Sequence, residues 1–476
     1  MHQPLRYFQA NNFWPLRDTL AFSDSLIGYA PLGMLGGGPR VAIIRYNLLY
    51  LFAYALAFAA AFLLARELGV GGWAAAVAGA VFAYAPWRIA QDIHLNIISS
   101  GGIPLSLFLM LRGFRKRKPR LVLAGWLVAG WQLSLGFALG LQLAYLLAAL
   151  AAVAAGAWLV RGRPRLDRSL AWASALGIAI FLGWAAIQAR PIFRVVRDHP
   201  EARRTMAEVT FFSPPPRGLL AAPAESLVWG KITAGLRETL PWPIEQTLFV
   251  GALTLTLALA GLVAPTYRRS LRILLAIGVV VSTLLALGFR LGDGRFTYRL
   301  LYEYAPGWQG VRTPGRLITI TTLALALLAA GGAQWMIVDR RRDGAGSATS
   351  RVPKTRVMTA SLLLVAILIE GSGRSVRSPV PPAPPGLHRA VEPRLHVPSD
   401  YLNDLLYVFW STEGFPLLAN GTSSVIPPSV QRLRDSTKSF PDPASVEALK
   451  SWGIRTVVLH TDLAPATPWE GVAARP

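Results

Sequence analysis

The stretch WRIAQDIHLN, residues 87–96, places an arginine, an aspartate and a histidine between two long apolar runs. Ionisable side chains beside a membrane-length segment are of functional interest when they face a water-filled cavity. There, the carboxylate of Asp92 and the imidazole of His94 can bind a divalent cation or move a proton. Arg88 can hold a phosphate with two hydrogen bonds. The pattern therefore predicts a polar site at this junction.

Simpler interpretations of the same residues stay open. Trp87 and Arg88 can be interfacial anchors, and Asp92 can be the N-cap of the following span. An aspartate and a histidine two positions apart share a face in a strand or loop, but not in a helix. A joint role for Asp92 and His94 therefore requires that the segment is not helical at that point.

Two further segments carry candidate site residues. Asp24 precedes SLIGYAPLG and can either cap a short helix or form the wall of an active site. Three arginines recur at helical spacing and predict an amphipathic helix on the bilayer surface. They can anchor lipid headgroups or bind the phosphate of a lipid-linked substrate; they are Arg190, Arg194 and Arg197.

The elements that must position these residues are membrane spans. The 476 residues are 53% hydrophobic and 15% charged, whereas soluble proteins carry about a quarter charged residues. Apolar segments of roughly 20 residues recur, as in transmembrane helices. We expect an all-α polytopic protein with about ten spans, near 41–65, 70–87, 95–112, 120–138, 140–160, 169–189, 246–264, 271–288, 316–337 and 357–371.

Basic residues in the short loops set the expected orientation. The loop 112–120 holds six lysines and arginines and no acid, and the segments 161–168, 267–272 and 339–356 are also basic. Short basic loops lie on the cytoplasmic side. Residues 1–40, the loops 190–245 and 289–315 and the tail 372–476 then lie outside the cytoplasmic membrane, with the transmembrane domain at 41–371.

The net charge of +23 is explained in the same way. Basic loops bind anionic membrane lipids, and the sequence has no nucleic-acid-binding motif, so nucleic acid is not an expected partner. The chain has no cysteine, which excludes disulfides and thiolate metal sites. The loop 289–315 is aromatic and basic, and it can line a lipid- or sugar-binding groove or form an interfacial belt.

The tail follows a proline-rich linker at 378–386. We expect strands at 405–410 and 455–460, and a helix that Asp442 caps and that ends before Gly453. These elements predict a small α/β domain on the extracytoplasmic side.

The proposed topology leaves Met1 outside with no helix before it. We expect that an N-terminal helix is missing, through a misplaced start or because the chain is a fragment. The alternative is translocation of a genuine short N-terminal segment.

Several stretches together resemble the GT-C superfamily of integral membrane glycosyltransferases, which includes the protein mannosyltransferases and lipid A aminoarabinose transferases. They are NFWPLRDTLAFSDSLIG, YNLLYLFAYALAFAAAFLLAREL, FAYAPWRIAQDIHLNII, YEYAPGWQGVRTPGR and the tail from LLANGTSSVIPPS to GIRTVVLH. The resemblance implies sugar transfer from a polyprenyl-phosphate donor outside the cytoplasmic membrane.

The resemblance also implies site residues. These enzymes place an acidic general base in the first outer loop, and some bind a divalent metal ion with an acid in the second outer loop. If one helix is missing, Asp92 matches the second position, with His94 as a companion metal ligand. Asp24 is a neighbour of the first position, so the chain can lack its catalytic base.

A rival hypothesis is a non-catalytic membrane protein, either a transporter of lipid-linked glycans or an assembly partner in the cell envelope. Inverted repeats would favour a transporter, and none is visible. Few charged residues fall within the spans, which argues against ion-coupled transport.

Overall fold

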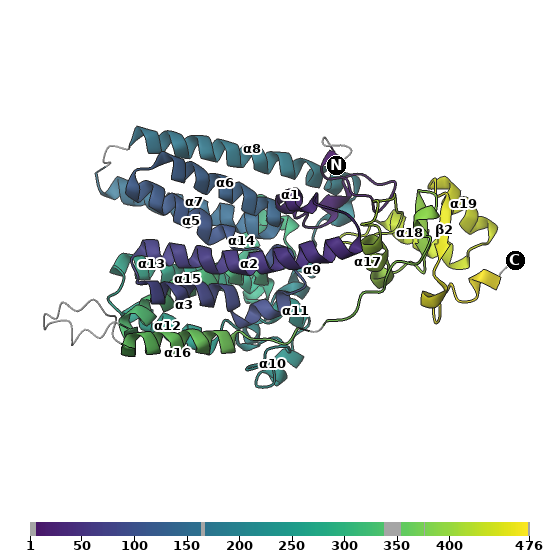
Figure 1. Ribbon diagram of the computed structural model, residues 1–476. Coiled ribbons are helices and arrows are strands. Elements are labelled where there is room, and N and C mark those ends of the chain that lie inside the picture. The colour runs from purple at the N-terminus through teal and green to yellow at the C-terminus, as the bar shows by residue number, and fades with distance from the viewer. Residues whose placement is uncertain (1–5, 163–166, 338–353, 376, 475–476) are drawn as a thin grey trace, which may run out of the picture. The chain divides into compact units, whose positions relative to one another are not determined.

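The computed structural model describes residues 6–162, 167–337, 354–375 and 377–474. The chain forms two compact units. We call one the terminal unit, which comprises Met1–Leu48, Ala186–Arg203 and Arg377–Pro476. The other, the helical unit, comprises Leu49–Ala185 and Arg204–Val376. Figure 1 labels their elements.

Six helical segments in the described part of the chain are long and apolar enough to cross a membrane. The chain is thus a helical, multi-pass membrane protein. The segments are α2 (Pro39–Leu68), α4 with α5 (Leu95–Ile98 and Gly102–Lys116), α7 (Phe137–Val160), α8 (Arg168–Asp198), α13 (Arg269–Ala286), and α15 (Ile318–Ile337) with the 3-10 turn Pro314–Leu317 before it.

The other four expected spans are also helical, but each is shorter than 18 residues. They are α3 (Gly72–Tyr84), α6 (Pro119–Leu135), α12 (Ala252–Val263) and α16 (Lys354–Glu370). The predicted total of ten membrane crossings is therefore not confirmed. Shorter helices lie between the long ones: α9 (Met206–Phe212), α10 (Ala234–Glu238), α11 (Pro243–Gln246) and α14 (Tyr298–Tyr304).

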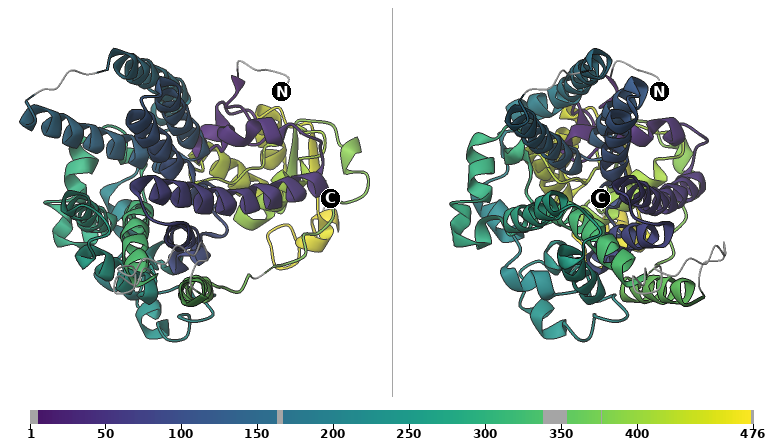
Figure 2. Two further views of the ribbon diagram at one scale, coloured as in Figure 1. Left: turned by 60° about the vertical axis from the view of Figure 1, so that its left-hand side comes forward. Right: turned by 90° about the vertical axis from the view of Figure 1, so that its left-hand side faces the viewer.

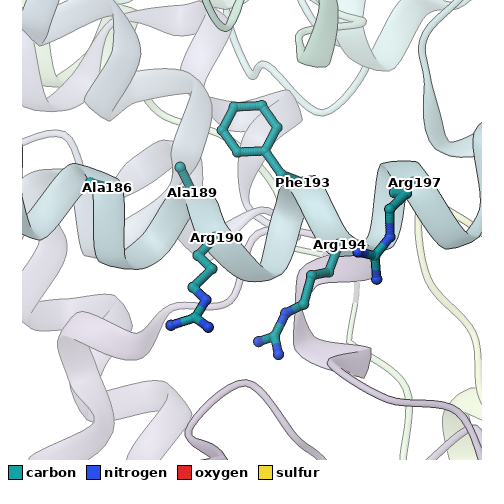
Figure 3. A pocket seen from close by; sticks show the side chains of 6 residues that line it. All are labelled: Ala186, Ala189, Arg190, Phe193, Arg194 and Arg197. Carbon is teal, nitrogen blue, oxygen red and sulfur yellow. The ribbon is translucent and has the colours of Figure 1, made fainter.

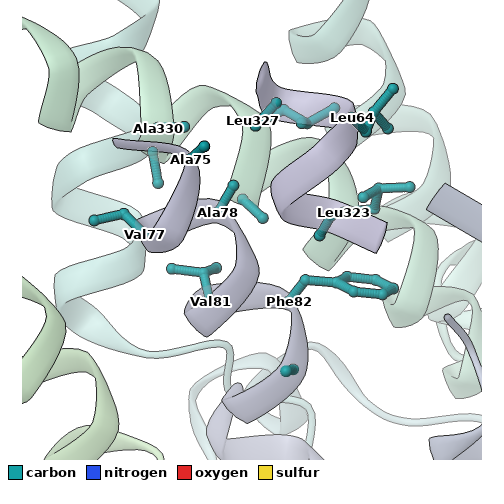
Figure 4. Packing of buried hydrophobic residues seen from close by; sticks show 14 of the residues in the cluster. Leu64, Ala75, Val77, Ala78, Val81, Phe82, Leu323, Leu327 and Ala330 are labelled. Carbon is teal, nitrogen blue, oxygen red and sulfur yellow. The ribbon is translucent and has the colours of Figure 1, made fainter. Parts of the chain in front are cut away.

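The core of the helical unit surrounds α15, which is buried along most of its length and packs on α3, α12 and α13. Glycines allow α12 and α15 to approach closely, as small residues do in membrane helix pairs. A Cβ on Gly261 would stand 1.9 Å from the Leu328 carbonyl oxygen, and one on Gly332 would stand 2.2 Å from that of Leu257. Small side chains such as Ala75 fill the surrounding core (Figure 4).

Two helix ends meet at one end of this unit. Glu67 near the end of α2 lies 3.0 Å from Arg112 and 3.7 Å from Arg115 of α5. The basic loop after α5 therefore begins beside the end of α2, and the sidedness of this end stays a prediction. The basic residues at 163–166 and 338–353 lie outside the described residues.

Glu370, the last residue of α16, caps a different helix. Its buried carboxylate accepts hydrogen bonds from the backbone N–H of Ala252 (2.6 Å) and Leu253 (3.3 Å), and from the indole of Trp229 (3.1 Å). The free N–H groups at a helix N-terminus need acceptors, and a negative charge there is favourable. Glu370 thus fixes the start of α12 against the end of α16.

Glu370→Ala should destabilise the protein by about 1–3 kcal/mol, because it leaves buried donors without an acceptor. We expect a smaller loss for Glu370→Gln, which keeps one carbonyl oxygen. Thermal unfolding in detergent measures both, with the exposed Glu238→Ala as the control. Equal unfolding temperatures for Glu370→Ala and Glu238→Ala would contradict the capping role.

The terminal unit is built around a small sheet. Strands β1 (Arg394–Val397) and β2 (Thr456–Leu459) pair in parallel, with Arg394 opposite Thr456. Backbone hydrogen bonds extend the sheet to residues 417–420 and then to residues 11–14 near the N-terminus. Figures 1 and 2 show this N-terminal segment beside the elements of the tail. Residues from the two ends of the chain therefore fold together.

One predicted strand is wrong, because residues 405–410 belong to helix α17 (Tyr401–Trp410). Asp400 caps this helix by accepting the N–H groups of Leu402 and Asn403. Its buried face repeats every third residue, at Asp404, Tyr407 and Trp410, which is a helical period.

The other elements expected in the tail are confirmed. Asp442 accepts the N–H of Ser445 at 2.7 Å and caps α19 (Pro443–Ser451), and β2 lies within the predicted strand 455–460. The tail also contains α18 (Pro428–Ser436), whose Arg434 donates to the buried carboxylate of Asp404 at 2.7 Å.

Helix α8 extends further than the predicted span 169–189 and contains Pro191. Because proline has no N–H, it cannot bond to the carbonyl four residues before it. The hydroxyl of Tyr7 donates to that carbonyl, of Ile187, at 2.8 Å. The last turns of α8 thereby join the N-terminal segment within the terminal unit.

Candidate functional site

The junction WRIAQDIHLN contains a short 3-10 helix, Pro86–Gln91, followed by a turn at Asp92 and Ile93. His94 leaves the helical conformation, with φ −113° and ψ 78°, and α4 begins after it. The segment is therefore not helical between Asp92 and His94, as a joint role of these two residues requires. Asp92 does not cap α4, since His94 is the N-cap residue and no side chain caps that helix.

Trp87 and Arg88 are both buried, so neither is an interfacial anchor. The indole of Trp87 donates to the Thr322 hydroxyl at 3.0 Å. Arg88 is 1% exposed, donates to the Ile98 carbonyl and the Ser100 hydroxyl, and lies 5.2 Å from the ring centre of Tyr54. Burial lowers its pKa. Phosphate binding by Arg88 would require this packing to open, and it stays a prediction.

Asp92 is half-buried and lies near a second acid, Glu225. Burial raises the pKa of Asp92, and the charge of Glu225 raises it further. Both effects disfavour the ionised carboxylate. Such a carboxylate binds a proton more readily than an ordinary surface aspartate, as a general base must.

His94 faces a different acid. Its Nε2 lies 4.0 Å from the carboxylate of Glu245, which is 5% exposed. Arg316 donates to both oxygens of this carboxylate, at 2.6 and 3.3 Å. Burial alone would raise the pKa of Glu245, but Arg316 and, to a lesser extent, His94 lower it below the ordinary value. The result is a buried, ionised carboxylate between two basic groups.

A second arginine extends this cluster. Arg312 lies over the ring of Phe212 at 4.8 Å and 3.8 Å from the carboxylate of Glu208. Its side chain is 31% exposed, against 12% for Arg316. We call His94, Glu245, Arg312 and Arg316 the junction cluster.

Glu245, Arg312 and Arg316 do not stand out individually in the sequence. The motif GVRTPGR lies in the basic, aromatic loop and in one of the stretches that resemble the GT-C superfamily, and no local pattern marks PIEQ, which contains Glu245. Glu245 and Arg316 are 71 positions apart, so only the fold reveals their pairing.

In the terminal unit, Arg190, Arg194 and Arg197 line one face of α8 and an open hollow of about 400 Å³. Figure 3 shows the side chains of Arg190 and Arg194 on the same side of the helix. Arg194 pairs with Asp18 at 3.1 Å, and Arg197 with Asp198 at 2.8 Å. Arg190 is exposed and forms no ion pair within the described part of the chain.

Asp24 belongs to the same unit. It lies in an irregular link between two 3-10 turns, Thr19–Phe22 and Ile27–Tyr29. The second turn has Leu26 as its N-cap residue and no side-chain cap, so Asp24 does not cap it. Asp24 and the arginines of α8 thus belong to one unit, and Asp92, Arg88 and His94 to the other. A site shared by all of them stays a prediction.

The residues present do not fit the proposed metal site. Asp92 and His94 face different acids, Glu225 and Glu245. Among the described residues, no group of three histidine or acidic side chains is arranged to hold a metal ion.

The solved structures that are similar to this chain include one archaeal enzyme. It is the archaeal oligosaccharyltransferase AglB from Archaeoglobus fulgidus, in complex with an inhibitory peptide and a dolichol-phosphate, at 13% sequence identity and a TM-score of 0.40. The similarity covers 94% of this chain and 61% of that chain, so the chain spans less than two thirds of its length. No protein-family model matches the chain, and neither does any curated protein.

Proposed function

We propose that this chain is a membrane glycosyltransferase that transfers a sugar from a polyprenyl-phosphate donor on the extracytoplasmic side of the membrane. The observation that carries the proposal is the junction cluster, which holds two arginines and a buried carboxylate directly before a membrane-length segment. Because the donor's phosphate is at the membrane surface, cationic side chains at that position can bind it.

The reaction requires an acceptor base and charge neutralisation at the leaving group. In the proposed step, the acceptor hydroxyl loses its proton to the Asp92 carboxylate. The acceptor oxygen bonds to the anomeric carbon of the sugar, and the bond from that carbon to the phosphate oxygen breaks. Polyprenyl phosphate leaves with the electron pair.

The two arginines have different proposed roles. Arg316 is held by both oxygens of Glu245 and is mostly buried, so we assign it to positioning. Arg312 is more exposed, and stacking on Phe212 restrains its guanidinium. A planar, restrained guanidinium suits a phosphate, and we assign the leaving group to Arg312.

Arg190 on α8 is a second candidate for the lipid-linked substrate. Its hollow also contains Ala186, Ala189 and Phe193. A cation beside an apolar surface matches a phosphate carried on a hydrocarbon chain. Arg194 is less suited, because Asp18 pairs with it at 3.1 Å, closer than the 3.8 Å between Arg312 and Glu208.

The full chain, reconstituted in proteoliposomes with a polyprenyl-phosphate-linked labelled sugar and a membrane extract as acceptor, tests the proposal. We expect labelled product and free polyprenyl phosphate. Arg312→Gln should slow transfer about tenfold, through loss of one charge-assisted hydrogen bond. The control is Arg295→Gln, because Arg295 also stacks on a phenylalanine, at 5.6 Å, in the same unit.

Two outcomes would reject catalysis. Movement of intact donor across the bilayer would indicate a transporter. If the folded protein in liposomes neither consumes the donor nor moves it, the result would favour a non-catalytic assembly partner.

A further inference from the structure

The tail contains a pocket that is unrelated to the junction cluster. Its volume is about 300 Å³, and it lies between the proline-rich segment and the elements β1 and α17. Pro384, Pro385 and Leu387 form one wall. The opposite side is formed by Arg394 and His396 of β1 and by Tyr407 and Trp410 of α17.

Arg394 gives the pocket a buried cation. It is 5% exposed, and one of its terminal nitrogens donates to the Leu387 carbonyl at 2.6 Å. Its Nε is buried and has no hydrogen-bond partner within the described residues. A buried guanidinium with an unused donor is costly unless another group pairs with it.

The rings of the aromatic wall pack against one another. The ring of His396 lies 4.9 Å from that of Tyr407, which lies 5.8 Å from that of Trp410. The Nδ1 of His396 lies 2.8 Å from the Nε2 of His460, and burial lowers the pKa of His396 to about 3. At neutral pH this imidazole is therefore uncharged, and Arg394 is the cation deep in the pocket.

The proline-rich wall is also fixed in place. The indole of Trp410 donates to the Pro381 carbonyl at 2.8 Å, and Arg394 holds the Leu387 carbonyl. Proline restricts the backbone, so this wall loses little freedom when a ligand binds. Glu413, an exposed carboxylate among the lining residues, repels anions and accepts hydrogen bonds from hydroxyl groups.

We infer that this pocket binds a small anionic sugar, with its carboxylate or phosphate at Arg394 and its ring against Trp410 and the prolines. The hydroxyl groups of the sugar then face Glu413. Pockets of this size that combine an apolar wall with a few polar groups are typical small-molecule sites. The inference uses no residue of the junction cluster, so it stands apart from the proposed function.

The test is calorimetric titration of the full chain in detergent with glucuronate, glucose 1-phosphate, glucose and inorganic phosphate. We expect saturable binding of at least one anionic sugar. Glucose, which lacks the anion, and inorganic phosphate, which lacks the ring, should bind at least tenfold more weakly. Whichever of glucuronate and glucose 1-phosphate binds more tightly identifies the anionic group.

Two variants and one control locate the binding. Arg394→Met should weaken it at least tenfold, whereas Arg389→Met, on the same segment but exposed, should leave it unchanged. Because Arg394→Met can also disturb the proline-rich wall, Ala383→Phe supplies an independent test: it fills the pocket and keeps Arg394. Saturable binding that survives Ala383→Phe, or no binding of either anionic sugar, would overturn the inference.

Discussion

Replacing Asp92 with asparagine should reduce sugar transfer by at least about 100-fold, the lower end of the usual contribution of a general base. Asparagine keeps the size of the side chain but cannot accept the acceptor's proton. Asp92 is half-buried in a turn, and its side chain does not cap α4, so the variant should fold normally. Initial rates in proteoliposomes at equal protein amounts give the measurement, and an unchanged rate would remove Asp92 from the reaction.

The pH dependence offers a second measure of the same residue. The base must be ionised, so the rate should rise with pH through the pKa of Asp92, which burial and Glu225 raise above the ordinary value of about 3.9. Glu225→Gln removes one of these causes, so the rise of the transfer rate should shift to lower pH while transfer continues. An unchanged pH dependence of the rate in this variant would show that a group other than Asp92 controls the rise.

Glu245→Gln should destabilise the protein by about 3–5 kcal/mol, because it leaves the buried Arg316 without its counter-charge. Glu303→Gln is the matched control. Glu303 and Arg299 approach to the same distance, 2.6 Å, but their side chains are 33% and 42% exposed, and solvent-accessible pairs contribute little. We expect no measurable change for Glu303→Gln in thermal unfolding.

The stabilising effect of Glu245 should also depend on pH. Its pKa is lowered in the folded protein, so its contribution is complete above the ordinary pKa of a glutamate, about 4.3. The contribution is lost as the pH falls through the lower folded value. The difference between wild type and Glu245→Gln should therefore be constant near neutral pH and shrink only in acid. A difference that already shrinks at neutral pH would contradict an ionised Glu245.

The sequence predicts the helices well, because apolar runs of membrane length have few alternatives to helix in lipid. It predicts their lengths less well. In α8, the apolar run becomes basic near Arg190, but the helix continues to Asp198 past Pro191. The error at 405–410 has a local cause: LLYVFW has a strand-like composition, whereas the cap at Asp400 and the three-residue period of the buried side chains belong to a helix.

The candidate site is less accessible to sequence reasoning. Asp92 and His94 stand out because they are ionisable residues beside apolar runs. Glu245 comes from α11 and Arg316 from the 3-10 turn Pro314–Leu317, and their pairing depends on how these distant elements pack. Arg88 is the opposite case. It stands out in the sequence as an arginine at the boundary of a span, but it is buried in the structure. Residue type alone does not distinguish a substrate ligand from a residue that supports the fold.

The proline in α8 has a structural consequence beyond a missing bond. In a regular helix each interior carbonyl already accepts the backbone N–H four residues later. Pro191 leaves the Ile187 oxygen available, and Tyr7, 180 positions earlier, uses it. Leucine at position 191 would bring a backbone N–H to the same oxygen, and Tyr7 would then share its acceptor with the helix.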